Sequence, residues 1–190
     1  MNRKLLIGAG ATTLAIGGLY FLKPHTTQTP TTNTSSQTAT DNAQQVAPGL
    51  YENKITNIST IPGLEIIKTE VENIIGPDGK AQDDHLQVTV KNTSATTLTS
   101  FEAYYTITDT KTQQKEGYFQ KLDGFSVDSG KTAIISFDGA SGAGHFPVNT
   151  SSLFYKSQNK LQFAVEISAA GVAPQNSTVT KDAGGAETQD

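Results

Sequence analysis

The chain contains no cysteine and no tryptophan among its 190 residues. Without cysteine it has no disulfide framework, no thiolate metal ligand, no cysteine nucleophile and no lipid-modified cysteine. Charged residues make up only 17% of the chain, and the net charge is -4. The basic patch or stripe that nucleic-acid binding requires is therefore missing, and we expect no nucleic-acid partner.

One long uncharged run is present, from Leu5 to Leu22, between the basic residues Arg3, Lys4 and Lys23. A membrane-spanning helix needs roughly 17–25 such residues, whereas the apolar core of a secretory signal peptide has roughly 7–15. No Ala-x-Ala cleavage pattern follows the run. The sequence therefore predicts a signal-anchor helix over residues 1–23, which holds the chain in the membrane through Leu5 to Leu22.

The charges at the two ends of this run predict its orientation. Arg3, Lys4 and the amino terminus outweigh Lys23, so the positive-inside rule places the N-terminus in the cytoplasm and everything after Lys23 outside. Glycines and threonines lower the apolarity of the run, which leaves a cleaved signal peptide as the alternative. We expect a single-pass protein of the cell membrane with an extracytoplasmic domain, or a secreted domain if the signal is cleaved.

Two polar stretches flank the part of the chain that carries hydrophobic patterning. Residues 24–60 are rich in Thr, Ser, Gln and Pro and hold few large apolar side chains, so they bury too little surface to offset the entropy of ordering. We predict a disordered linker there, either a plain tether or a stalk. Residues 172–190 are polar, glycine-containing and mildly acidic, and we predict a disordered tail.

Between these stretches, residues 61–171 alternate apolar and polar side chains with a period of two, which is typical of half-buried strands. Turn residues separate the strands at roughly 8–12-residue spacing, and no helix-strand alternation supports an α/β fold. The sequence therefore predicts one all-β domain, an antiparallel β-sandwich. Its expected strands are Leu64–Ile75, Leu86–Val90, Leu98–Asp109, Lys115–Leu122, Thr132–Phe137 and Leu161–Ile167. Residues 150–156 fit either a single helical turn or a short strand.

The stretch LQVTVKNTSATTLTSFEAYYTITD, with the turn Ser129-Gly130-Lys131 and the strand TAIISFD after it, resembles the bacterial FxLYD-type and related immunoglobulin-like extracytoplasmic domains. In that pattern a strand ends in a V-x-N-x-S turn, here Val90–Ser94. A second strand carries alternating aromatics toward an Asp, here Phe101–Asp109. The resemblance covers about half of the folded block and implies an immunoglobulin-like β-sandwich in an anchored, non-catalytic module. The Phe-x-Leu-Tyr-Asp string itself is missing, the segment GASGAGHFPVNTSSLFYK is longer than the pattern, and no family site residue carries over.

The glycine-rich segment Gly139–Asn149 is the one unusual loop. Phosphate-binding loops lead into a helix N-terminus, but Pro147 interrupts the chain soon after the last glycine. The order Gly139-x-Ser141 is that of a nucleophile elbow, yet Ala143 replaces its final glycine, which disfavours a serine hydrolase with His145 as base. We predict a mobile connection between strands, with His145 as a candidate for ligand binding.

Asp83-Asp84-His85 is the only cluster that suggests a metal. Calcium needs six to eight converging oxygen ligands, but consecutive residues of an extended chain point alternately to opposite sides. One side then offers too few ligands, and without cysteine the scattered histidines do not make a zinc site. We predict a solvated acidic turn and no bound metal.

Two aromatic doublets, Tyr104-Tyr105 and Tyr118-Phe119, carry the binding hypothesis. If their strands pair as a hairpin, Tyr105 lies near Tyr118, and Tyr104 lies near Phe119 on the opposite face. One pair belongs to the core. The other, Tyr104 with Phe119, is expected on the outer face, where an amphipathic ring can take a sugar, a peptide or another protein. The plainer interpretation is a cross-strand pair that stabilises the sheet by about 0.2–1 kcal/mol.

No base, nucleophile and orienting group occur in an arrangement that strands could bring together. We therefore expect no enzymatic activity and no cofactor. The expected function is a non-catalytic binding, adhesion or structural role at the cell envelope, with an envelope protein or a polysaccharide as the candidate partner. The alternative is an accessory or sensor domain of an envelope enzyme system, which would bind a small ligand near Gly139–Asn149.

Overall fold

The computed structural model describes residues 52–185. The predicted anchor at residues 1–23 and the predicted linker up to residue 51 lie outside the described residues, as does the end of the predicted tail from residue 186. Within the described range, no helix combines the length and the apolarity needed to span a bilayer.

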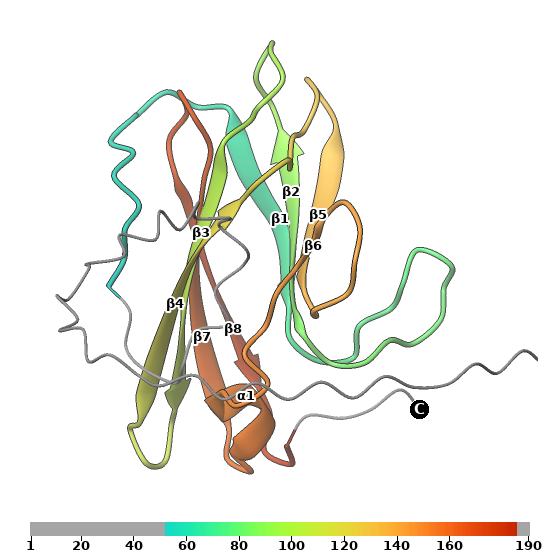
Figure 1. The fold of residues 1–190 in the computed structure, drawn as a ribbon, viewed down its shortest axis with the longest axis vertical. Helices are drawn as coiled ribbons and strands as arrows, with labels where there is room; N and C mark the ends of the chain where they lie inside the picture. Colours follow the sequence, from blue (N-terminus) through green and yellow to red (C-terminus); the bar gives the residue numbers. More distant parts are fainter. Residues whose placement is uncertain (1–51, 186–190) are drawn as a thin grey trace, which may run out of the picture. The chain divides into compact units, whose positions relative to one another are not determined.

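The strands of the described range lie in two sheets that face each other (Figure 1). One sheet has the order β1-β2-β5-β6 and the other the order β4-β3-β7-β8, and only β5 with β6 is a parallel pair. The predicted all-β fold is confirmed as two packed, largely antiparallel sheets. The elements are β1 (Leu64–Glu70), β2 (Leu86–Asn92), β3 (Phe101–Asp109), β4 (Lys115–Leu122), β5 (Thr132–Phe137), β6 (His145–Phe146), α1 (Leu153–Lys156), β7 (Leu161–Ser168) and β8 (Gln175–Lys181).

The predicted strand limits agree with the structure for β4 and β5 and differ elsewhere. β1 ends at Glu70 rather than Ile75, because the chain turns at Asn73, whose φ of 53° lies in the left-handed region. The N–H of Asn73 donates to a carboxylate oxygen of Asp84 at 3.0 Å, which fixes this turn. β3 begins at Phe101, slightly later than predicted.

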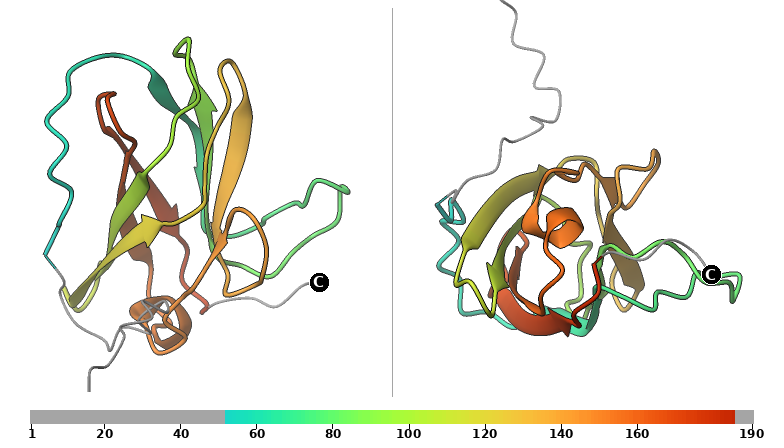
Figure 2. Two further views of the ribbon diagram at one scale, coloured as in Figure 1. Left: turned by 45° about the horizontal axis from the view of Figure 1, so that its top comes forward. Right: turned by 90° about the horizontal axis from the view of Figure 1, so that it is seen from below.

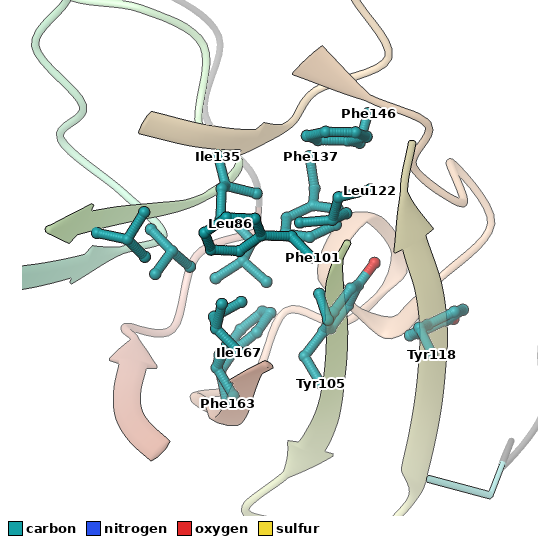
Figure 3. Close-up of a cluster of buried hydrophobic side chains, with 14 of the residues drawn as sticks. Leu86, Phe101, Tyr105, Tyr118, Leu122, Ile135, Phe137, Phe146, Phe163 and Ile167 are labelled. Atoms are coloured by element: carbon teal, nitrogen blue, oxygen red, sulfur yellow. The ribbon is translucent and has the colours of Figure 1, made fainter. Parts of the chain in front are cut away.

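Alternate apolar residues from the strands form the core between the sheets (Figure 3). Tyr105 stacks on Tyr118 with ring centroids 5.1 Å apart and contacts Phe137 of the opposite sheet, also at 5.1 Å. Burial raises the pKa of Tyr105 well above its usual range. The side chains that the period-two pattern assigns to the core are all buried: Val88, Val90, Phe101, Tyr105, Phe163 and Val165.

Asn92 organises the turn that follows β2. Its side chain is fully buried, and its amide donates to the carbonyl oxygens of Thr96 and Val127, each at 2.7 Å. Its side-chain oxygen accepts the N–H of Ser94 at 2.8 Å. Because buried polar groups are costly unless they are hydrogen-bonded, these bonds account for an asparagine at this position of the V-x-N-x-S turn.

The segment at residues 150–156 contains the short helix α1, which resolves the two alternatives left by the sequence. Seen from below, α1 lies across the open end between the two sheets (Figure 2). Phe154 packs edge-on against Phe163 at a centroid distance of 5.9 Å. A carboxylate oxygen of Glu116 accepts the N–H of Leu153 at 2.8 Å and the hydroxyl of Tyr118 at 2.7 Å, which joins α1 to β4.

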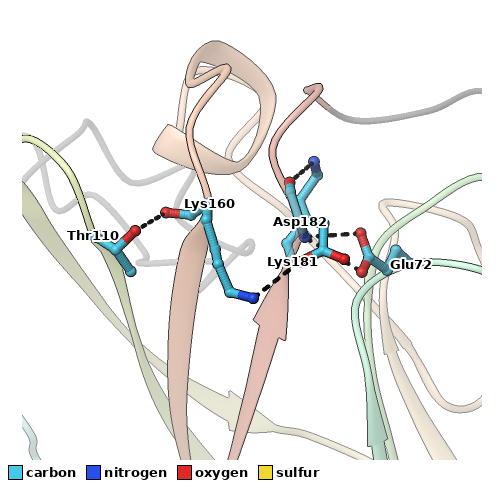
Figure 4. Close-up of polar contacts among 5 residues, drawn as sticks. All are labelled: Glu72, Thr110, Lys160, Lys181 and Asp182. Atoms are coloured by element: carbon cyan, nitrogen blue, oxygen red, sulfur yellow. Dashed lines mark hydrogen bonds and ion pairs between the residues drawn. The ribbon is translucent and has the colours of Figure 1, made fainter.

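A strand occupies part of the predicted tail, so the prediction of disorder was wrong for residues 175–181. β8 pairs with β7, and the hydroxyl of Ser177 accepts that of Thr69 in β1 at 3.0 Å. After the strand, the N–H of Asp182 donates to the Glu72 carboxylate at 3.1 Å (Figure 4). Composition misled the prediction because the inward side of this edge strand is largely polar, with Val179 as its one hydrophobic contact to the core.

Lys181, the last residue of β8, has a side chain that is only 1% exposed. Its ammonium lies 6.0 Å from the ring centroid of Phe154 and donates to the backbone carbonyls of Asp182, at 3.3 Å, and Gly185. The apolar stem is thereby buried while the charged head is held by carbonyl dipoles.

Residues 52–62, which we call the entry segment, contain no strand but are fastened to the β4-β3-β7-β8 sheet. The side-chain amide of Asn57 donates to the hydroxyl of Ser168 at 3.0 Å and to the carbonyls of Ala169 at 2.9 Å and Val172 at 2.8 Å. The predicted linker is therefore wrong for its last part, from residue 52 to residue 60. Its composition gives no sign of this attachment, because one amide supplies the main bonds.

Candidate functional site

The outer face of the β4-β3-β7-β8 sheet carries an open groove of about 460 Å³, which we call the cross-strand groove. It crosses all four strands, and three inter-strand spacings of about 4.8 Å give it a length of about 14 Å. The entry segment borders it through Asn53. The lining residues are Asn53, Tyr104, Thr106, Lys115, Ala164, Val165, Glu166, Asn176, Ser177 and Thr178.

Short side chains form the floor of the cross-strand groove. Thr106 of β3 lies opposite Gly117 of β4 and Ala164 of β7, and Ala164 lies opposite Thr178 of β8. Because side chains alternate between the two faces of a strand, this whole row points outward. Because these small side chains lie between rows of longer ones, the sheet surface is hollowed there, and this hollow is the cross-strand groove.

Longer polar side chains form the walls. Tyr104, Glu166 and Asn176 lie side by side in the register of β3, β7 and β8, one row along from the floor. Lys115 of β4 stands beyond the floor on the other side. Partial burial, together with the nearby charge of Glu52, raises the pKa of the Tyr104 hydroxyl, which is therefore neutral at physiological pH.

The lining contains one acidic and one basic side chain together with several neutral hydrogen-bonding groups. Glu166 carries the carboxylate and Lys115 the ammonium. The side-chain amide of Asn53 donates to a carboxylate oxygen of Glu166 at 2.7 Å. A carboxylate has about four lone-pair sites, so Glu166 keeps acceptor capacity for a ligand.

The pairing predicted for the aromatic doublets is confirmed. Tyr105 lies opposite Tyr118 and both are buried, whereas Tyr104 lies opposite Phe119 and both are half-buried on the outer face. Of the two candidate residues, Tyr104 lines the cross-strand groove, and Phe119 is its neighbour in β4 outside the lining.

His145 belongs to β6 in the other sheet, so the structure does not bring it together with Tyr104 and Phe119. Its Nδ1 lies 2.8 Å from a carboxylate oxygen of Asp138. In residues 52–185, no protein hydroxyl is hydrogen-bonded to its Nε2. A second groove, of about 300 Å³, lies beside Glu102 on the same outer face as the first, and no residue of 139–149 lines either groove.

Gly144, the last glycine of the loop before β6, has a packing role. Its φ of 84° lies in the left-handed region, and a Cβ atom there would lie 2.6 Å from the carbonyl oxygen of Ile134. Its own carbonyl accepts the N–H of Ser136 at 2.7 Å. Glycine at this position therefore lets the loop close against β5.

Asp84 and His85 are buried, so the predicted solvated acidic turn was wrong for these two residues. The cause is local. The turn after β1 folds back onto them, with Asp84 bonded to the N–H of Asn73 and Nδ1 of His85 lying 2.7 Å from the carbonyl of Asp83. Within residues 52–185, no three histidine or acidic side chains are grouped in a way that could hold a metal ion.

Sequence reasoning missed most of the groove lining. Asn53 and Asn176 lie in stretches that composition assigned to the linker and the tail. Lys115 and Glu166 lie on predicted strands, and the outward positions of alternating strands were the one available signal for them. No protein-family model matches the chain, and no curated protein matches it either.

Proposed function

We propose that this chain is a membrane-anchored extracytoplasmic module with a non-catalytic binding role, and that the cross-strand groove is its binding surface. The observation that carries the proposal is the half-buried Tyr104 in a groove that crosses four strands. Concave sites that hold a few converging polar groups are the usual form of ligand sites. The candidate partner is a protein or a polysaccharide of the cell envelope.

The finer fold within this proposal is immunoglobulin-like, of the FxLYD-type group. The strand orders support it, because β1-β2-β5 follows the A-B-E order of an immunoglobulin domain. The order β4-β3-β7-β8 likewise follows C′-C-F-G. The short parallel strand β6 takes the edge position where such domains have an antiparallel strand D.

We propose no catalytic activity because of how the two possible acid-base groups of the domain are placed. The Asp138–His145 pair is the nearest approach to an acid-base arrangement, and it is partly exposed on a loop with no hydroxyl at Nε2 in the described part of the chain. Glu166 in the groove bonds to an amide rather than to a nucleophile.

A double substitution tests the binding surface. Tyr104→Ser with Phe119→Ser removes both outer-face rings, while Ile67→Ser with Ile134→Ser removes exposed apolar side chains from the other sheet. We expect the first pair to reduce capture of the partner from envelope extracts while thermal unfolding stays cooperative, and the control pair to leave capture unchanged. Equal capture by all forms would reject this surface.

The proposed membrane topology is tested separately. Membrane fractionation followed by protease treatment of intact cells should leave only an N-terminal stub of the protein. Full protection of the domain from protease would reject the proposed topology without bearing on the groove.

A further inference from the structure

We infer that the cross-strand groove binds a short stretch of an uncharged polysaccharide chain. The inference rests on the proposed function, since it names the class of ligand for the same surface. It is argued from the direction of the groove across the strands, from its small floor, and from the mixture of one half-buried aromatic ring with amides, hydroxyls and a carboxylate.

The position of the groove disfavours a peptide that adds a strand to the sheet. Such peptides pair their backbone with an exposed strand edge. β3 and β7 lie in the middle of the sheet, and each is hydrogen-bonded to a neighbour on both sides. The groove lies on the face and runs across these strands, so it offers a ligand no unpaired strand edge along β3 and β7.

The lining also disfavours the other common ways of binding a peptide. A helix in a groove needs a continuous apolar stripe, but the floor here is Thr106, Ala164 and Thr178. Proline-rich segments need several aromatic walls, and Tyr104 is the single aromatic residue of the lining. Phosphorylated segments need clustered arginines, whereas Lys115 is the only cation of the lining.

The same lining fits a ligand that presents many hydroxyl groups and no net charge. The amides of Asn53 and Asn176 and the hydroxyl of Thr178 offer both donors and acceptors. Glu166 offers free acceptor sites beside its bond to Asn53. The half-buried ring of Tyr104 supplies an apolar surface for the C–H face of a sugar and a neutral hydroxyl at its edge.

The test is a binding titration of the full chain, kept in a detergent without a sugar headgroup, with cellohexaose, chitohexaose and maltohexaose. Binding is followed by the amide signals of the protein in NMR spectra. We expect saturable shifts with at least one of the three, confined to groove strands such as residues 104–106, 164–166 and 176–178.

Matched variants locate the binding. Tyr104→Ala should weaken binding by about tenfold, because it removes the ring. Thr178→Val keeps the shape of the side chain, removes the hydroxyl of a lining residue and should weaken binding by about fivefold. Thr180→Val makes the same change at the next outward position of the same strand, outside the lining, and should leave binding unchanged.

Failure of this inference differs from failure of the proposed function. No saccharide shifts, or shifts that survive both Tyr104→Ala and Thr178→Val, would overturn the polysaccharide assignment. If the Tyr104→Ser and Phe119→Ser double variant nevertheless loses partner capture, the surface stands and its ligand is a protein. If capture also persists, the surface itself is wrong.

Discussion

Asn53 and Glu166 are joined by a hydrogen bond of 2.7 Å, although 113 positions separate them in the sequence. Asn53 belongs to the entry segment, and Glu166 stands in the wall of the cross-strand groove. The path from the N-terminal part of the chain into the domain therefore runs beside the proposed binding surface. A ligand that bonds to Glu166 would therefore lie next to Asn53 of the entry segment.

Asn57, not Asn53, should hold the entry segment in place. Asn57→Ala removes three donated hydrogen bonds and leaves the carbonyls of Ala169 and Val172 without this partner, so it should lower the free energy of unfolding by about 2 kcal/mol. Asn53→Ala removes two exposed bonds, one to Glu166 and one from the N–H of Ile55, and should change the free energy of unfolding by less than about 0.5 kcal/mol. Urea denaturation and limited proteolysis within residues 52–62 measure both effects. Equal effects of the two substitutions would show that the segment is not anchored at Asn57.

Asn92 should be among the most sensitive polar positions of the domain. Asn92→Ala removes the two bonds that the buried amide donates to the carbonyls of Thr96 and Val127 and takes the acceptor from the N–H of Ser94, so it should cost about 3 kcal/mol in the free energy of unfolding. The exposed Asn176 serves as the control, with a change within about 0.5 kcal/mol for Asn176→Ala. Chemical denaturation compares them, and a neutral Asn92→Ala would contradict the structural role of this turn.

Lys181 should contribute mainly through its buried stem. Lys181→Met keeps a long flexible side chain over Phe154 and should change the free energy of unfolding by less than about 1.5 kcal/mol. Lys181→Ala leaves a cavity and should cost about 2–3 kcal/mol. Guanidinium denaturation separates the two cases. If Met were as damaging as Ala, the bonds from the ammonium to the carbonyls of Asp182 and Gly185 would carry the stabilisation instead.

The carboxylate of Asp109 should make the stability of the domain depend on pH in the acidic range. The side-chain amide of Asn159, the N–H of Thr112 and the hydroxyl of Ser157 donate to its carboxylate and hold the pKa of Asp109 well below its usual range. A carboxyl whose pKa is lower in the folded chain stabilises the fold above its unfolded pKa of about 3.9 and loses that contribution as the pH falls below it.

The substitution Asp109→Asn should therefore lower the thermal midpoint at neutral pH, and the gap to the unaltered protein should narrow as the pH falls below about 4. Thermal unfolding followed by circular dichroism across this pH range makes the measurement. A gap that stays constant down to acid pH would mean that ionisation of Asp109 does not contribute to stability.

The period-two pattern predicted the core and the faces of the central strands, because the alternation of Tyr104 and Tyr105 leaves only one way for each to point. It could not predict β8, since the inward positions there include Ser177, which is held by a hydrogen bond, and Lys181, whose charge hides the fact that its stem is buried. The attachment of the entry segment depends on the single amide of Asn57, which no local pattern marks. Most of the groove lining was missed because no local sequence pattern marks those residues either.

The most direct test of the cross-strand groove as the binding surface is site-specific photo-crosslinking of the full chain on intact cells. A benzophenone amino acid replaces Tyr104 in one form and Thr132, an exposed residue on the other sheet, in the second. We predict a discrete crosslinked product from position 104 and none from position 132. Products from position 132 alone, or the same products from both, would contradict the assignment of the groove.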